Sequence, residues 1–133
     1  MIRRLKETDI HRVAAIWLDT NIKAHSFVPE NYWKENLQYV KDRLLEAEVY
    51  VFEDRVQGIV GFIGIEGDYI EGLFVKEGMY SRGIGKRLLD YVKQEKTHLV
   101  LHVFAKNTEA IKFYEREDFK IQMEEKEDGT GEM

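Results

Sequence analysis

The 133-residue chain contains no cysteine and only one proline, Pro29. Without cysteine it has no disulfide framework, no zinc–thiolate site and no cysteine nucleophile, which is typical of a cytoplasmic enzyme or binding domain. It also lacks any apolar run near the roughly 20 residues that a membrane helix needs. The opening MIRRLKETD has no apolar stretch typical of a signal peptide. We therefore expect a cytoplasmic protein with no membrane partner.

An excess of basic residues is also missing, because 20 Lys and Arg stand against 25 Asp and Glu, a formal net charge of −5. Proteins that bind nucleic acids normally present a basic face, so we expect no nucleic-acid partner. The acidic balance favours a cationic partner such as an amine. No grouping of His, Asp and Glu has metal-ligand spacing, so we assign no metal. No linker or repeat divides the chain, which predicts a single domain over 1–133, with an acidic tail at 125–133 that need not be ordered.

Hydrophobic periodicity predicts an α/β sandwich with the element order βααβββαβαβ. The expected helices cover 8–24, 30–48, 84–96 and 107–117. The expected strands cover 1–5, 49–53, 56–65, 69–75, 98–105 and 119–125. In the second helix the pattern places Trp33, Leu37, Val40, Leu44 and Leu45 on one apolar face. The middle three strands form a meander, while the strand–helix–strand crossovers that follow favour parallel pairing.

Two glycines, Gly83 and Gly85, open the helix expected at 84–96. The first N–H groups of a helix have no internal partners, and glycines let a phosphate approach them closely. Arg82, Lys86 and Arg87 would add positive charge there. Close packing of a helix on a sheet also uses glycine, so the motif alone leaves both interpretations open. Arg87 stands where a P-loop needs Ser or Thr, and Leu88 stands where a dinucleotide fold needs a third glycine.

In context these residues resemble the GNAT superfamily of acyl-CoA-dependent N-acetyltransferases. That family ends its fourth strand in LYV-like residues and opens the next helix with a Gly-x-Gly/Ala pattern. The matching residues here are Leu73, Phe74, Val75, Gly83, Ile84 and Gly85. A downstream Asn-x-x-Ala-x-x-x-Tyr segment is matched by Asn107, Ala110, Phe113 and Tyr114. The element order also agrees with the family's fold, a mostly antiparallel N-terminal sheet with a parallel strand pair at the cofactor cleft.

The resemblance implies direct acetyl transfer from acetyl-CoA, in a ternary complex, to a primary amine of a small molecule or peptide. It implies that the cofactor is held by Leu73, Phe74, Val75, Tyr80, Ser81, Arg82, Gly83, Ile84, Gly85, Lys86, Asn107 and Phe113. It also implies that Tyr114 protonates the leaving thiolate, since a phenol is protonated at neutral pH. The spacing of Ala110, Phe113 and Tyr114 equally fits a buried helix face.

The acceptor amine must lose a proton before it can attack, and Glu71 is the leading candidate base. It lies in a strand that otherwise reads as buried, where a desolvated carboxylate has a raised pKa. The alternative is a Glu71 that faces solvent at the edge of the sheet or pairs with a lysine. His25 is a second candidate because imidazole titrates near neutrality, whereas His102 reads as a sheet residue.

The sequence departs from the family pattern at several positions. Tyr80 replaces an Arg or Gln, Glu77 replaces a common proline, and Asp118 stands where a glycine often occurs. The family's seventh strand would follow EDGTGE, so it is either dispensable, removed by shortening, or supplied by another chain, as in a homodimer. Two alternatives to an enzyme follow: a non-catalytic acyl-CoA-binding or sensing domain, and a partner module that pairs through an open edge at 119–124.

Overall fold

The computed structural model describes residues 1–79 and 82–120. Their strands form one five-stranded sheet in the order β1-β2-β3-β4-β5. The strands are β1 Ile2–Arg4, β2 Glu48–Asp54, β3 Gly58–Glu66, β4 Tyr69–Val75 and β5 Val100–Leu101. The helices are a 3₁₀ turn at Glu7–Asp9 and α1 Ile10–Ala24, α2 Glu30–Glu35, α3 Leu37–Glu46, α4 Ile84–Lys93 and α5 Thr108–Arg116. β1 to β4 pair antiparallel, and β4 and β5 pair parallel. This arrangement confirms the predicted mixed fold.

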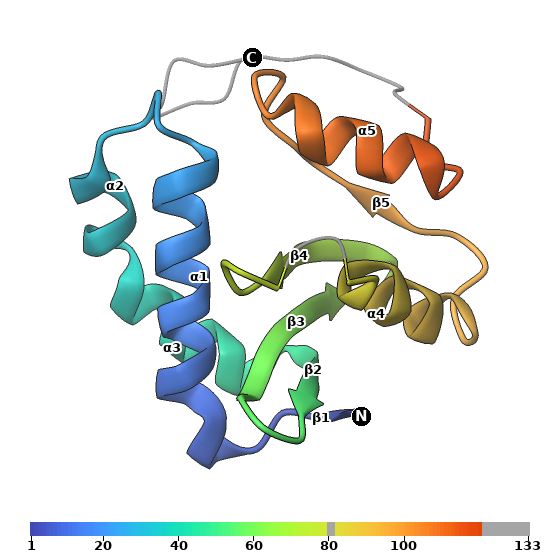
Figure 1. Cartoon of the computed structure of the whole chain (residues 1–133), viewed down its shortest axis with the longest axis horizontal. Coiled ribbons are helices and arrows are strands. Elements are labelled where there is room, and N and C mark those ends of the chain that lie inside the picture. The colour runs from blue at the N-terminus through green and yellow to red at the C-terminus, as the bar shows by residue number, and fades with distance from the viewer. Residues whose placement is uncertain (80–81, 121–133) are drawn as a thin grey trace.

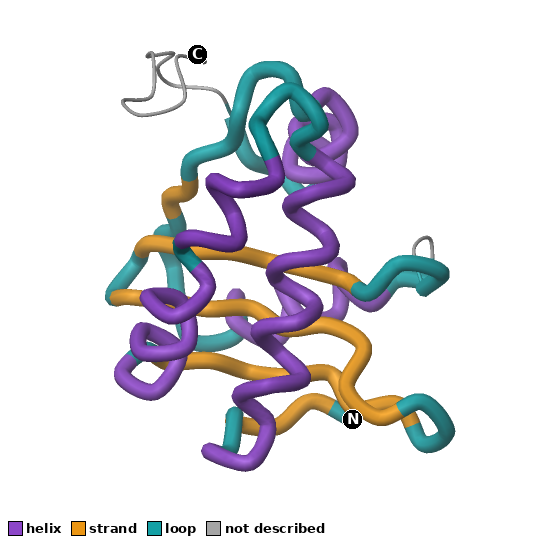
Figure 2. The backbone as a smooth tube through the Cα atoms, turned by 90° about the vertical axis from the view of Figure 1, so that its left-hand side faces the viewer, coloured by secondary structure: helices purple, strands orange, loops and turns teal. Residues whose placement is uncertain are grey.

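Helices cover both faces of the sheet, with α1 and α3 crossing one face and α4 lying behind the other (Figures 1 and 2). β3 is buried along most of its length, because its side chains alternate between two apolar layers. One layer joins α1 and α3 to the sheet through residues such as Val13, Leu44 and Phe62. The other joins α4 through Leu88, Leu89 and Ile63, among others. No described helix has the length and apolar character needed to cross a bilayer.

The long helix predicted over 30–48 is divided at Asn36 into α2 and α3, which corrects that prediction. The Asn36 side-chain amide donates to the Tyr32 carbonyl at 2.6 Å, so it binds the oxygen that its own backbone N–H would bind in a continuous helix. The backbone N–H of Asn36 instead donates to Trp33 at 3.2 Å. Leu45, predicted on the apolar face, is 58% exposed, whereas its neighbour Leu44 is buried.

The strand predicted over 98–105 is much shorter than expected. Only Val100 and Leu101 pair with β4, opposite Tyr69 and Ile70. After this point the two parallel strands separate, so within residues 1–79 and 82–120 no strand pairs with the C-terminal part of β4 on that side. The strand predicted over 119–125 falls almost entirely outside the described residues, as does the predicted tail at 125–133.

Candidate active site

The helix predicted to follow the glycines begins as expected, with Gly83 as the N-cap of α4. Gly83 has φ +76°, a left-handed conformation that glycine adopts without a Cβ clash, and open space lies where its Cβ would project. Gly85 is different. A Cβ there would lie 3.5 Å from Phe113 and 3.8 Å from Val75. The structure thus brings the start of α4, the end of β4 and α5 together.

β4 contains a bulge at Glu71. Gly64 pairs with Gly72 and the adjacent Ile65 pairs with Ile70, so Glu71 has no partner across the ladder. A bulge frees backbone groups from the sheet and bends the strand. Leu73 and Val75 then pack toward the α4 layer, while Phe74 packs toward the α1 and α3 layer. The bulge and the separation from β5 together expose backbone donors and acceptors in this part of β4.

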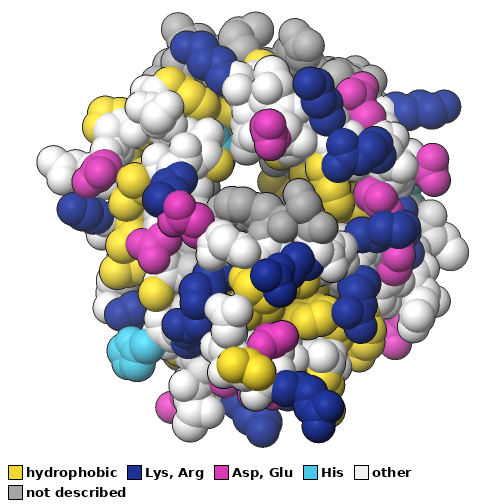
Figure 3. Space-filling model, viewed as in Figure 1, with side chains coloured by type: hydrophobic (Ala, Val, Ile, Leu, Met, Phe, Trp, Pro, Cys, Tyr) yellow, Lys and Arg dark blue, Asp and Glu magenta, His cyan; other side chains and the backbone are white. Residues whose placement is uncertain are grey.

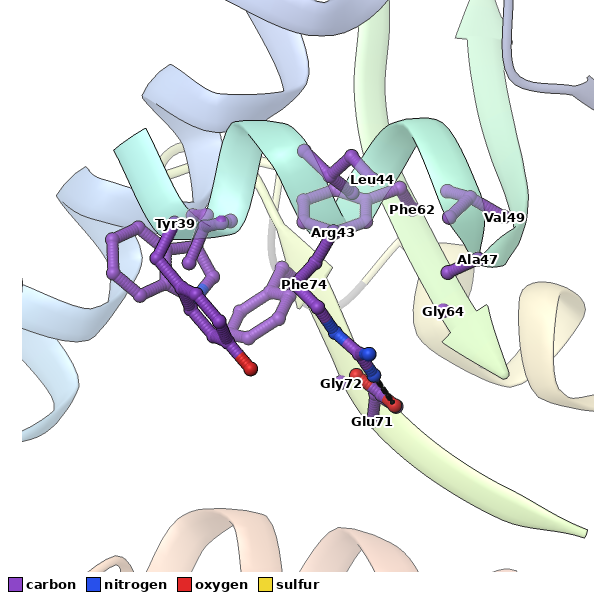
Figure 4. Close-up of a pocket in the computed structure, with 12 residues that line it drawn as sticks. Tyr39, Arg43, Leu44, Ala47, Val49, Phe62, Gly64, Glu71, Gly72 and Phe74 are labelled. Carbon is purple, nitrogen blue, oxygen red and sulfur yellow. Dashed lines mark hydrogen bonds and ion pairs between the residues drawn. The ribbon is translucent and has the colours of Figure 1, made fainter. Parts of the chain in front are cut away.

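A pocket of about 150 Å³ lies beside the bulge, between α1, α3 and the sheet (Figure 4). Its walls are mostly apolar and include Trp17, Leu44, Phe62 and Phe74. A Cβ at Gly72 would collide with the far end of the Phe74 ring, so a larger residue there would force that ring to move. The rim carries Tyr39, Arg43 and Glu71. The pocket is therefore mostly apolar with charged groups on its rim. The surface of the molecule is also hollowed between the α1 and α5 sides (Figure 3).

Glu71 does not face solvent alone, since its carboxylate is paired with the Arg43 guanidinium (Figure 4). Arg43 also reaches Glu66 at 2.8 Å, which makes a cluster of two carboxylates and one cation. Burial raises the pKa of Glu71, the neighbouring Glu66 raises it further, and Arg43 opposes the shift. In the same cluster the pKa of the more exposed Glu66 is lowered by its hydrogen bonds with Glu71 and Arg43. Glu71 thus combines a solvent-accessible carboxylate with a pKa above its ordinary value.

Tyr114 lies on α5 and packs between Phe113 and Phe119, with ring centroids 5.1 and 5.4 Å away. Its side chain contacts the apolar layer under α4. Burial raises the pKa of its hydroxyl, so the phenol keeps its proton at neutral pH. The predicted helix carries it as expected, since Asn107 caps α5 by accepting from the Ala110 N–H at 3.2 Å.

His25 is buried, with 8% of its surface exposed. It caps the C-terminus of α1 and contacts the rings of Phe27, Trp33 and Phe104. Its Nε2 is 3.3 Å from Asn107 Nδ2. Burial lowers the pKa of its imidazole, and the Asn21 carbonyl partly offsets this shift. His102, by contrast, is hydrogen-bonded to the Tyr69 hydroxyl at 2.9 Å.

The other described residues predicted to hold the cofactor include three around the start of α4, namely Arg82, Ile84 and Lys86. Ile84 is buried in the layer under that helix. The Lys86 ammonium is paired with Asp90 at 3.3 Å and with Glu117 at 3.2 Å, so it ties α4 to the end of α5. Arg82 is exposed. Tyr80 and Ser81 lie outside the described residues.

Three residues of this site were not singled out from the sequence: Arg43, Tyr39 and Gly72. Arg43 and Glu71 are 28 positions apart, and no local spacing links them. Gly72 could have been noticed because it is a glycine inside a predicted strand, and such glycines often mark a bulge or a site where a ligand or another backbone approaches closely. The described residues contain no group of three or more His, Asp or Glu that could hold a metal ion.

Comparisons with known proteins place this geometry in a family. The acetyltransferase (GNAT) domain matches residues 46–121. Over 123 residues the chain is 36% identical to the peptidyl-lysine N-acetyltransferase YiaC of Escherichia coli, with 91% of this chain and 84% of that one covered. The solution structure of apo YjaB from Escherichia coli superposes with a TM-score of 0.87 at 26% identity, covering 99% and 91% of the two chains. PaiA N-acetyltransferase from Thermoplasma acidophilum, solved with coenzyme A, shares the fold with a TM-score of 0.77 at 22% identity, over 99% and 94%.

The chain therefore belongs to the GNAT family of acetyltransferases. This membership confirms the predicted resemblance and makes the protein an acyl-CoA-dependent enzyme whose donor is acetyl-CoA. The alternatives of a sensing domain and of a purely structural partner module are not supported by it.

Proposed function

We propose that this enzyme transfers the acetyl group of acetyl-CoA to the side-chain amine of a lysine within a peptide or protein, directly and in a ternary complex. The observation that carries the proposal is the pocket beside the Glu71 bulge. Its apolar walls suit the four-carbon stem of lysine, and its rim presents a carboxylate to the ammonium. The naming of a 36% identical relative as a peptidyl-lysine N-acetyltransferase supports the same acceptor class.

The residues around the start of α4 fit the proposed donor. Gly83 is the N-cap of α4 and has open space at its Cβ position, and helix N-termini bind phosphates through free N–H groups and the macrodipole. Gly83, Ile84, Gly85 and Lys86 would hold the diphosphate, and Leu73 to Val75 would hold the arm through backbone groups freed beside the bulge. Acetyl-CoA supplies an activated thioester when bound.

Glu71 is the proposed base. Its carboxylate lies on the pocket rim, and its raised pKa lets it accept a proton from an ammonium more readily than an ordinary glutamate does. Arg43 opposes this rise in the pKa of Glu71, which favours the ionised form that a base requires. His25 is a weaker candidate, because its imidazole is buried and its Nε2 faces Asn107.

Tyr114 is the proposed acid. Its hydroxyl retains its proton at neutral pH and makes no hydrogen bond to another described residue that would compete for that proton. Its position on α5 places it on the opposite side of β4 from the pocket, since it packs with the α4 layer. Base and acid then lie on the two sides of the strand that holds the thioester.

The experiment measures acetyl transfer from acetyl-CoA to a lysine peptide whose α-amine is blocked, with mass spectrometry locating the added group. We expect acetylation of the lysine Nζ, and none when arginine replaces that lysine. Glu71→Gln should lower kcat on the order of a hundredfold by removing a general base. Glu66→Gln is the matched control, because it removes the neighbouring carboxylate that also pairs with Arg43 and should cost much less.

Two results would count against the proposal. Transfer to small amines with none to lysine peptides would overturn the acceptor class. Equal losses in Glu71→Gln and Glu66→Gln would show that the carboxylate pair acts only through its charge, and Glu71 would no longer be the base.

A further inference from the structure

A cluster of aromatic rings at the end of α1 encloses His25. The rings of Phe104, Trp33 and Phe27 lie 4.7, 5.4 and 5.7 Å from the imidazole, between ring centroids. Phe27 and Trp33 come from the segment after α1, whereas Phe104 comes from the loop that leads into α5. The Lys106 ammonium lies over the outer side of Phe27, 5.4 Å from its centroid. This cluster thus joins two parts of the chain that the sheet does not connect directly.

Asn107 determines how the imidazole must be protonated. Asn107 is the N-cap of α5, and its Oδ1 accepts a hydrogen bond from the Ala110 N–H. This bond identifies which atom of the side-chain amide is the oxygen and which is the nitrogen. The other end, Nδ2, is a donor and points at His25 Nε2 from 3.3 Å. Nε2 must therefore accept, so the proton of the neutral ring lies on Nδ1. That Nδ1 is buried and forms no hydrogen bond of ordinary geometry among the described residues.

The His25–Asn107 contact spans 82 positions of sequence and connects the end of α1 to the cap of α5. Figure 1 shows α1 to the left of β4 and α5 above it, as two separate parts of the molecule. Tyr114 is four residues beyond Ala110, one helical turn along α5. A change in how α5 is capped would therefore move Tyr114 relative to β4.

We propose that His25 is a positioning residue: its neutral imidazole accepts a hydrogen bond from Asn107, orients that amide to cap α5, and so holds Tyr114 in place from the α1 side. This inference rests on the proposed function, since it takes α5 to carry the acid. It also explains why a histidine with an unavailable Nε2 lone pair lies so close to the site. The same lone pair cannot both accept from Asn107 and take a proton from an amine.

Two substitutions separate positioning from proton transfer. His25→Phe keeps the ring cluster but removes the acceptor, and we expect kcat to fall on the order of tenfold with the acceptor KM within about twofold of wild type. His25→Gln places an amide oxygen near the Nε2 position, and we expect it to restore most of kcat. His98→Phe and His98→Gln, at an exposed histidine, are the controls and should match wild type.

A second readout needs no acetyl transfer. Hydrogen exchange of the first-turn amides of α5 should speed up in His25→Phe and remain near wild type in His25→Gln, because only the first loses the orientation of the cap. If wild type acetylated no lysine peptide, the proposed function would fail while this exchange result could still stand.

The proposal would be overturned by a His25→Gln variant as inactive as His25→Phe, because an amide cannot replace a base. Unchanged kcat and unchanged α5 exchange in His25→Phe would overturn it as well.

Asn107→Asp provides an independent test if the His25 variants fold poorly. It keeps the capping oxygen and turns the donor facing Nε2 into an acceptor, so His25 should now favour its charged form. We expect the His25 pKa, followed by imidazole NMR titration, to rise by about one unit or more. An unchanged or lower pKa would show that Asn107 does not face the imidazole in solution.

Discussion

Glu71 illustrates what single residues contribute to the account. Its place in a buried-looking strand predicted a raised pKa, and the structure gives that direction through burial and the neighbouring Glu66. The sequence left open whether Glu71 forms an ion pair, and the structure adds Arg43 as its partner. The two interpretations are compatible, because a paired carboxylate on a pocket rim can still exchange its partner for a cationic substrate. No local pattern predicts a contact between α3 and β4, so this part of the site required the fold.

Replacing Tyr114 by phenylalanine tests the acid. The ring would still pack between Phe113 and Phe119, so the fold and acetyl-CoA binding should be retained. Loss of the proton donor should lower kcat by about 10² to 10⁴. Steady-state kinetics combined with calorimetric titration of acetyl-CoA measures both quantities. Undiminished turnover would remove Tyr114 from the mechanism, and loss of acetyl-CoA binding would assign it a packing role.

Arg43→Gln tests the tuning of the base. Arg43 lowers the pKa of Glu71 against the effect of burial, so its removal should raise that pKa. The rate depends on ionised Glu71 and falls below its pKa, so the acid limb of the kcat/KM profile should move to higher pH. Arg55→Gln, at the exposed β2–β3 turn, is the control. A limb that stays in place, or moves to lower pH, would contradict the assignment of that limb to Glu71.

Among the elements, the meander of β2, β3 and β4 and the helices α1, α4 and α5 were predictable from periodicity and turn signals. The break between α2 and α3 was not, because it depends on one side-chain amide that competes for a backbone carbonyl. The shortness of β5 was not predictable either. Its apolar composition fits a longer strand, but pairing requires a neighbour, and β4 is bent away by the bulge at Glu71.

The two glycines that precede and open α4 have different roles, and alanine substitutions should separate them. Gly83→Ala would place a Cβ on a residue in the left-handed conformation, which costs about 1 kcal/mol or more of conformational free energy. The substitution would also disturb the N-terminus of α4. We expect acetyl-CoA binding to weaken about tenfold or more. Gly85→Ala makes only ordinary contacts with Phe113 and Val75 and gains helix propensity, so stability should hold or increase.

Calorimetric binding and thermal melting of the two variants check this prediction. If Gly85→Ala weakened acetyl-CoA binding more than Gly83→Ala does, the diphosphate would contact the backbone at Gly85, and the prediction for Gly83 would be wrong.

For the whole molecule, the two apolar layers on either side of the sheet explain why the fold agrees so well with the sequence prediction. Alternating and helical patterns specify which face of each element is buried, and these patterns extend over long segments. The site is less predictable because it is assembled where regular pairing stops. The glycine and tyrosine motifs indicated a site in this region only through the family resemblance. The contacts that tune them, Arg43 with Glu71 and His25 with Asn107, depend on tertiary structure.

Stability should depend on pH through His25. Its folded-state pKa is lowered below the ordinary value near 6.5, so the unfolded chain binds more protons there. The contribution is present above about pH 6.5 and is lost as the pH falls toward the folded-state pKa. Urea unfolding at a series of pH values should show this loss in wild type and a smaller one in His25→Phe. Equal slopes for the two proteins would contradict a buried, neutral His25.

The central claim is that acetyl-CoA lies at the N-terminus of α4, between β4 and α5. Hydrogen–deuterium exchange with and without coenzyme A tests it most directly. We predict protection at 82–86, at Leu73 to Val75 and in α5, with no change in β1 or β2. Protection confined to other elements, or none at saturating coenzyme A, would contradict the account.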